Sequence, residues 1–288
     1  MTWGELRAHC EQVLAEAARE RPARLVLDWF DDVYGGASRR ADEAVPKANL
    51  LSVEVQLREL ADGRPLAYVT GVAHFYGYEL EVGPGALIPR PETEELVRWI
   101  LETHALRPAL TFVDVCCGSG CIAVALALRR LTWRGIAVDV SPHALAYARR
   151  NVAKHDLHGN LDVQQVDVLR DWSLLDEGYD IIVSNPPYIP ASDWHRVAEE
   201  VAAHEPRLAL LVDGDTPLAF YERIADKAAT ALVDGGWLYF ECNDRYAREV
   251  AQLLQARGWG SVEVFIDMQG KQRHVRGQRG DRASIQRP

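Results

Sequence analysis

Residues 112–128 read FVDVCCGSGCIAVALAL. An apolar, strand-like run leads into a loop that contains Gly118 and Gly120, and an apolar helical stretch follows. This order is typical of open α/β sheets, where glycines let a ligand approach the backbone at the carboxyl end of a strand. Asp139 follows Gly120 by 19 residues, close to the ~20-residue offset of a carboxylate that binds ribose hydroxyls. The pattern predicts a nucleoside site rather than a glycine turn needed only for packing.

The chain after Thr111 alternates between strand and helix signals, which predicts a parallel sheet with right-handed crossovers. Because a short turn at 267–271 joins the last two strands, we expect an antiparallel end to the sheet. The fold class is therefore α/β and Rossmann-like. The predicted strands are 111–115, 135–139, 161–165, 179–183, 236–241, 262–266 and 273–276, and the predicted helices are 120–130, 142–155, 217–232 and 246–257.

The first 73 residues have a different pattern. Helical periodicity appears at 2–20, 23–33 and 49–60, which predicts a small N-terminal helical domain over 1–73. We expect a hairpin or extended connector at 74–90, a catalytic domain at 91–279 and a disordered tail at 280–288.

Composition narrows the function classes. The 288 residues carry a net charge of −10, which argues against binding long stretches of nucleic acid through a basic face. The sequence has no signal-peptide pattern and no apolar run long enough to span a membrane. It contains five cysteines, and this odd number does not suggest a disulfide framework. We expect a cytoplasmic, monomeric protein without membrane contact. Because Cys116, Cys117 and Cys121 lack a C-x-x-C pair or a nearby histidine, we predict no metal site.

The segment RPETE begins at Arg90 and opens a helix. Pro91 suits the first turn of a helix, and the three glutamates complement the positive end of the helix dipole. Helix initiation does not explain Arg90, and we expect this residue to line a substrate site.

The stretch SNPPYIP, residues 184–190, follows the apolar strand 179–183. In a doubly wound sheet this strand lies beside the first one, so the corner and the glycine loop share one cleft. The Asn185 side chain offers a carbonyl oxygen, the Pro186 main chain offers a second one, and Tyr188 offers a flat face. Two converging acceptors suit a planar NH₂ group held by both hydrogens. A structural Pro-Pro turn with a capping Asn is the alternative.

The glycine loop alone does not identify the nucleoside, because a dinucleotide motif also tolerates the alanine at position 123. A planar NH₂ group is a weak nucleophile, and holding both hydrogens aims its lone pair at an electrophile. A nucleoside cofactor combined with such a group points to methyl transfer from S-adenosylmethionine.

These motifs resemble the protein-glutamine N5-methyltransferases that act on peptide chain release factors. The similar segments are RPLAYVTGVAHFYGYELEVGPGALIPRPETEELV, AVDVSPHALAYARRN, SNPPYIP, HEPRLALLVDGD and DMQGKQRHVRGQ, and they span 65–277. The resemblance implies a class I methyltransferase fold with a seven-stranded sheet, and methylation of the glutamine in a Gly-Gly-Gln motif. The helical part fits the family's substrate-docking domain in size.

The resemblance also implies residue roles. The cofactor would be bound by Cys116, Cys117, Gly118, Ser119, Gly120, Asp139, Asp167, Val168 and Asn185, with Val168 beside the adenine. The substrate glutamine would be held by Asn185, Pro186, Pro187 and Tyr188. Cys116 in place of a glycine, Val168 in place of an aromatic residue and Asn243 in the segment ECN depart from the family pattern.

Three alternatives stay open. The same chemistry could act on a ribosomal-protein glutamine or on adenine N6 of nucleic acid, although the negative charge and the lack of a basic recognition region weigh against nucleic acid. The third is a non-catalytic module that docks a translation factor, and the intact NPPY corner argues against it.

Overall fold

The computed structural model describes residues 1–17, 40–172, 178–212 and 216–280. The chain divides into two compact units, residues 1–71 and 72–288. The predicted helix at 23–33 and the predicted tail after residue 280 lie outside the described residues, and the domain boundaries expected at 73 and 90 stay predictions.

The first unit is helical in its described part. The helices are α1 (Trp3–Ala17), α3 (Lys47–Ala61) and α4 (Leu66–Thr70). Leu6 and Cys10 of α1 and Val53 and Leu57 of α3 are buried in one hydrophobic cluster, so the predicted periodicity does mark buried faces of these two helices. Residues 18–20 of the first predicted helix lie outside the described residues. The short helix α4 was not expected; Pro65 precedes it and Gly71 ends it in a left-handed conformation, φ 76°.

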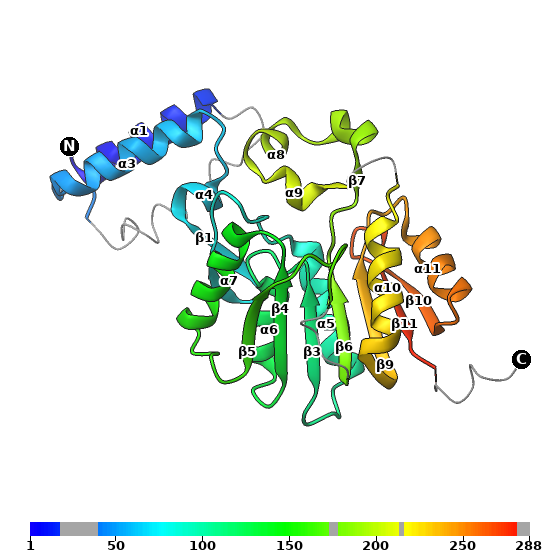
Figure 1. Ribbon diagram of the computed structural model, residues 1–288. Helices are drawn as coiled ribbons and strands as arrows, with labels where there is room; N and C mark the ends of the chain where they lie inside the picture. The colour runs from blue at the N-terminus through cyan, green and yellow to red at the C-terminus, as the bar shows by residue number, and fades with distance from the viewer. Residues whose placement is uncertain (18–39, 173–177, 213–215, 281–288) are drawn as a thin grey trace, which may run out of the picture. The chain divides into compact units, whose positions relative to one another are not determined.

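The second unit contains a seven-stranded sheet in the order β10-β11-β9-β6-β3-β4-β5. Its neighbours pair in parallel except at β11, which is antiparallel to both β9 and β10, and this confirms the predicted class I methyltransferase sheet. Figure 1 shows β5, β4, β3 and β6 side by side in the centre of this unit. The strands are β3 (Thr111–Val115), β4 (Arg134–Asp139), β5 (Leu161–Gln165), β6 (Tyr179–Ser184), β9 (Leu232–Glu241), β10 (Gly260–Ile266) and β11 (Gln272–Gln278).

Helices cover both faces of this sheet, as expected for crossovers between parallel strands. Successive residues of β3 point to opposite faces: Phe112 packs with α5, α6 and α7, whereas Val113 packs with α10 and α11. Burial on both faces explains why the strands are almost continuously apolar. These helices are α5 (Pro91–Thr103), α6 (Cys121–Arg129), α7 (Pro142–Lys154), α10 (Ala219–Ala231) and α11 (Ala247–Ala256).

Strand β9 begins four residues before the predicted start at Gly236. It pairs with β6 from Leu232, with a register irregularity between Tyr179 and Ile181. Gly235 within it has φ 77°, a left-handed conformation that glycine adopts without strain. Gly235 and Gly236 therefore lie at an irregularity inside the strand and not before it.

Two smaller sheets flank the main one. The first is an antiparallel hairpin of β1 (Val72–Phe75) and β2 (Tyr78–Glu81), one of the two forms expected for this segment. The second, which was not predicted, pairs β7 (Ile189–Pro190) in parallel with β8 (Leu211–Val212) and so fixes the chain that leaves the NPPY corner. The segment that connects β7 to β8 contains the 3₁₀ helix η2 (Ala191–Arg196) and helices α8 (Glu199–His204) and α9 (Arg207–Leu210).

None of the helices in the described ranges combines the length and the apolar character needed to cross a lipid bilayer.

Candidate active site

The glycine loop connects β3 to α6 through an unusual backbone path. Cys116, Gly118 and Gly120 all have positive φ, at 61°, 58° and 81°. Cys116 adopts this conformation although it is not glycine, a costly state of the kind that functional loops retain. A Cβ atom placed on Gly118 would meet no protein atom within 4 Å, so open space lies directly above this part of the loop.

Asp139 and the glycine loop are joined at the carboxyl ends of neighbouring strands. The Gly118 N–H donates to Asp139 Oδ2 and the Ser141 N–H donates to Oδ1, both at 2.9 Å. The backbone N–H of Cys117 also donates to the Val138 carbonyl, at 3.0 Å. Parallel pairing of β3 with β4 therefore brings the predicted ribose-binding carboxylate against the predicted cofactor loop.

A second carboxyl group, Asp114, lies inside the sheet below the loop. It is fully buried, and its Oδ2 accepts from the Ala123 N–H at the start of α6, at 3.1 Å. Among the described residues its Oδ1 has no hydrogen-bond partner. Burial raises the pKa of Asp114 to about 8 and also raises the pKa of Asp139. Asp114 was not predicted as a site residue, although an acid inside an apolar strand before a glycine loop was the available signal.

The thiols of the loop stay protonated at neutral pH. Burial raises the pKa of Cys116 and Cys117 well above the usual range and also raises that of Cys121. A protonated thiol is a poor nucleophile, and in this state the three cysteines are small, weakly polar residues of the loop and helix.

Asp167 and Val168 follow β5 at the same edge of the sheet. Asp167 Oδ1 accepts from the Leu169 N–H at 3.1 Å. The Val168 side chain is buried in the hydrophobic cluster that also contains Trp172, and the Trp172 indole donates to the Val168 carbonyl. A contact of Val168 with adenine stays a prediction.

The NPPY corner follows β6, which pairs with β3. Pro186 and Pro187 are buried, and Asn185 and Tyr188 are half-buried. The Asn185 Nδ2 amide donates to Thr93 Oγ1 at 3.4 Å, and Thr93 belongs to the PETE segment at the start of α5. The two segments that sequence analysis had treated separately therefore meet through these two side chains. Burial raises the pKa of the Tyr188 phenol to about 12, so this side chain keeps its proton.

Arg90 is held by a carboxylate from a distant segment. Its guanidinium lies 2.6 Å from Glu205 Oε1, and Glu205 Oε2 accepts from the Ile88 N–H at 3.1 Å. Glu205 is 5% exposed and lies in the quoted stretch HEPR. This clamp joins the connector before α5 to the segment after the NPPY corner, and a contact of Arg90 with substrate stays a prediction.

Asn151 in α7, which was not predicted either, connects the hairpin to the cofactor loop. Its Oδ1 accepts from the Glu81 N–H at 2.6 Å, and its Nδ2 donates to the Ser119 carbonyl at 2.9 Å. Asn151 is completely buried. A polar residue on the apolar face of a predicted helix was the signal.

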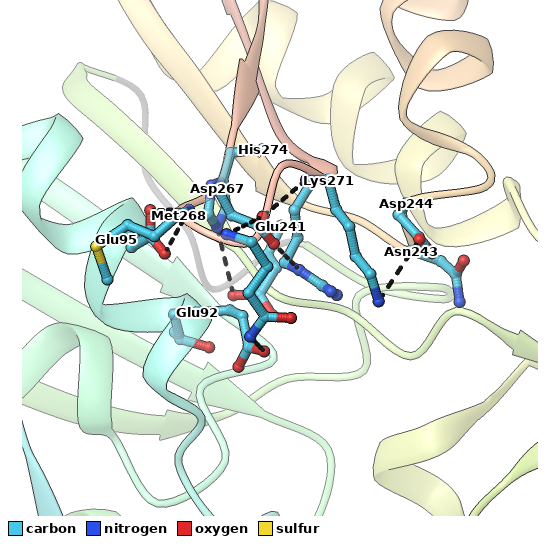
Figure 2. Close-up of polar contacts among 12 residues, drawn as sticks. Glu92, Glu95, Glu241, Asn243, Asp244, Asp267, Met268, Lys271 and His274 are labelled. Atoms are coloured by element: carbon cyan, nitrogen blue, oxygen red, sulfur yellow. Dashed lines mark hydrogen bonds and ion pairs between the residues drawn. The ribbon is translucent and has the colours of Figure 1, made fainter.

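Glu241, at the end of β9, is another buried carboxyl group of this region. Figure 2 shows Glu241 with Glu92, His274 and the turn that carries Asp267 and Lys271. In that turn the Met268 N–H donates to Glu95 at 3.2 Å, and the Gln269 amide donates to Glu92 at 3.0 Å. The turn therefore packs against the first turns of α5, beside the NPPY corner.

Comparison with known proteins gives matches over most of the chain. A family model described as "Methyltransferase domain" matches residues 112–204. The release factor glutamine methyltransferase of Cereibacter sphaeroides is 36% identical and covers 94% of this chain and 90% of its own length. The relative of the same name from Flavobacterium psychrophilum is 34% identical over 82% of each chain. A methyltransferase structure from Pyrococcus furiosus superimposes with a TM-score of 0.51 at 16% identity, covering 82% of this chain and all of that one.

Proposed function

Because this chain belongs to the release factor glutamine methyltransferase family, we propose that it transfers a methyl group from S-adenosyl-L-methionine to the side-chain nitrogen N5 of a glutamine in a peptide chain release factor. The proposed target is the glutamine of the Gly-Gly-Gln motif. The observation that carries this proposal is the NPPY corner of β6, set beside the glycine loop of β3.

The cofactor would lie against the glycine loop. Open space above Gly118 and the carboxylate of Asp139 at the end of the next strand fit a nucleoside with two ribose hydroxyls. Bound there, S-adenosylmethionine supplies an electrophilic methyl group on a sulfonium. Cys116 to Gly120 would contact it through the backbone, and Asp167 and Val168 would border the adenine.

The substrate amide would be held at the NPPY corner. Asn185 Oδ1 and the Pro186 carbonyl would each accept one N–H of the glutamine NH₂, and Tyr188 would pack against the planar carboxamide. Blocking rotation of the amide points the nitrogen lone pair in one direction, which lowers the entropic part of the barrier. Acceptors on both hydrogens also stabilise the positive charge that develops on nitrogen.

We also propose that the N-terminal unit docks the release factor, that the protein acts in the cytoplasm as a monomer, and that it does not bind extended nucleic acid. The substrates named for its relatives are translation factors, and the net charge of −10 disfavours a nucleic-acid partner.

The deciding experiment is incubation of the protein with purified release factor and S-adenosylmethionine, followed by mass spectrometry of the Gly-Gly-Gln peptide. A gain of one methyl group on the glutamine is expected. The matched control is a release factor whose Gly-Gly-Gln glutamine is replaced by alanine. Methyl transfer to that control, or transfer only to ribosomal proteins or RNA, would reject the proposed substrate.

A further inference from the structure

Glu241 and His274 form a buried polar pair whose atoms are incompletely bonded. Glu241 is 2% exposed and His274 is completely buried. Glu241 Oε2 lies 4.0 Å from His274 Nε2, and within the described part of the chain neither this oxygen nor either imidazole nitrogen has a hydrogen-bond partner. Burying a carboxyl group with an unpartnered oxygen costs folding free energy. Its position beside the NPPY corner therefore suggests a role in function.

Glu241 is linked to the corner through Thr93 and Asn185. Thr93 is 2% exposed, and its Oγ1 accepts from Asn185 Nδ2. The Thr93 and Asn185 side chains also lie close enough to the Glu241 carboxyl group to lower its pKa, against the effect of burial. These three side chains come from β9, α5 and the end of β6, so the network joins elements that are distant in sequence.

The charge of Glu241 gives this network a direction. An ionised carboxylate only accepts hydrogen bonds, and a threonine hydroxyl has a single proton to donate. When Thr93 donates to Glu241, its oxygen is left to accept from Asn185 Nδ2. The amide of Asn185 is then fixed with Nδ2 on Thr93 and with Oδ1 directed away from it.

We propose that ionised Glu241 is a positioning residue that, through Thr93, holds Asn185 in the orientation that presents Oδ1 to the substrate NH₂. This inference rests on the proposed function. A protonated Glu241 can itself donate, so Thr93 can turn and the Asn185 amide can rotate. Asn185 would then present its own NH₂ to the NH₂ of the substrate, which pairs two donors and weakens productive binding.

The surroundings of Glu241 predict when this change occurs. Burial raises the pKa of Glu241 to about 7, with Arg273 lowering it and Glu92 raising it. Burial lowers the pKa of His274 to about 4, so the imidazole is neutral at neutral pH and does not compete as a titrating group. The other titratable side chains that interact with Glu241 are Tyr188, Tyr221, Cys121 and Cys242, and burial raises the pKa of each.

Orientation of Asn185 needs the ionised form of Glu241, so turnover rises as pH increases through about 7. The test is the pH dependence of kcat for methylation of release factor. It is measured at saturating cofactor, so that titration of Asp114 and Asp139 does not affect the measurement through cofactor binding. We expect an ascending limb in the wild-type enzyme, and in Glu241→Gln a plateau about 10-fold lower with that limb removed. Glu241→Asp should restore a limb.

A matched pair at Thr93 tests the link itself. Thr93→Ser keeps the hydroxyl and should keep the wild-type profile. Thr93→Val keeps the shape but removes the hydroxyl, and should lower kcat about 10-fold. Glu92→Gln removes a neighbouring charge outside the network and should retain the plateau while moving the limb to lower pH. Cofactor affinity by calorimetry should fall less than kcat in these variants, because the glycine loop and Asp139 remain.

The outcomes separate this inference from the proposed function. Absence of methyl transfer by the wild-type enzyme would reject the proposed function. Transfer by the wild type together with an unchanged plateau and limb in Glu241→Gln would overturn the role of Glu241 alone. If Glu241→Gln fails to fold, equal kcat values for Thr93→Val and Thr93→Ser would overturn it equally.

Discussion

Asp139 Oδ2 lies 2.9 Å from the backbone nitrogen of Gly118, so the carboxylate expected to bind the cofactor also holds the loop that faces it. Its other oxygen accepts from the Ser141 N–H at the start of α7. A carboxylate offers about four acceptor sites, so these two bonds leave capacity for the two hydroxyls of a ribose. The same side chain can order the loop and contact the ligand.

Asp139→Ala should weaken S-adenosylmethionine binding by about 1.5–3 kcal/mol, the range for hydrogen bonds to a charged group. Asp139→Asn should also weaken it, because an amide NH₂ would then face the Gly118 or Ser141 N–H. Isothermal titration calorimetry measures both. Unchanged affinity in a folded Asp139→Ala protein would dismiss the ribose assignment.

Asp114 should make the stability of the ligand-free protein depend on pH. Its folded-state pKa of about 8 lies above the ordinary value of 3.8, so the folded protein keeps a proton that the unfolded chain releases. The contribution of Asp114 to the free energy of unfolding is therefore fully present below pH 3.8 and is lost as the pH rises toward about 8. Asp114→Asn cannot ionise, so its melting temperature should fall less than that of the wild type across this window. Parallel pH profiles of Tm for the two proteins would contradict this.

The Glu205 clamp should contribute to stability. Glu205→Ala removes the partner of both Arg90 and the Ile88 N–H, and we expect a loss of about 1.5–3 kcal/mol in the free energy of unfolding. Urea denaturation measures it. The control is Glu222→Ala, which breaks a 4.0 Å ion pair with Arg257 at the surface and should cost less than about 0.5 kcal/mol. Similar losses in both variants would argue against a special role of the clamp.

The sequence was sufficient for the main sheet because its strands repeat one simple pattern. The predicted strands 111–115 and 161–165 coincide with β3 and β5, and the strand before NPPY does lie beside the first strand. Each βα unit carries its own signal in apolar runs, glycines and caps, and the handedness of crossovers fixes the order.

The contacts around the site could not be predicted in the same way, because they join segments that are far apart in the chain. Thr93 and Asn185 are separated by 92 positions, and Arg90 and Glu205 by 115. No local periodicity links such pairs. PETE was correctly interpreted as the start of a helix, but the role of Thr93 appears only when β6 is placed beside that helix. The pairing of β7 with β8 was missed because two-residue strands carry no alternation.

The N-terminal unit should matter for the protein substrate and not for the cofactor. A chain that starts at Val72, where the second compact unit begins, should bind S-adenosylmethionine with wild-type affinity but methylate intact release factor poorly. Calorimetry and the peptide mass measurement test the two halves of this statement. Full activity of the shortened chain would make the helical unit dispensable and reject its docking role.

Asn185→Ala should reduce turnover by roughly 10²-fold or more, because it removes one of two acceptors that stop the substrate amide from turning, and a misplacement near 1 Å can cost this much. Cofactor binding should suffer less, since the glycine loop and Asp139 remain. Asn185→Asp is the sharper variant. It keeps an acceptor oxygen toward the substrate, but its second oxygen would replace the Nδ2 donor that now faces Thr93, so partial activity is expected. The measurement is kcat for the Gly-Gly-Gln glutamine, with circular dichroism to verify the fold. If Asn185→Ala works within a few-fold of wild type, the NPPY corner is only a turn, and the orientation mechanism is wrong.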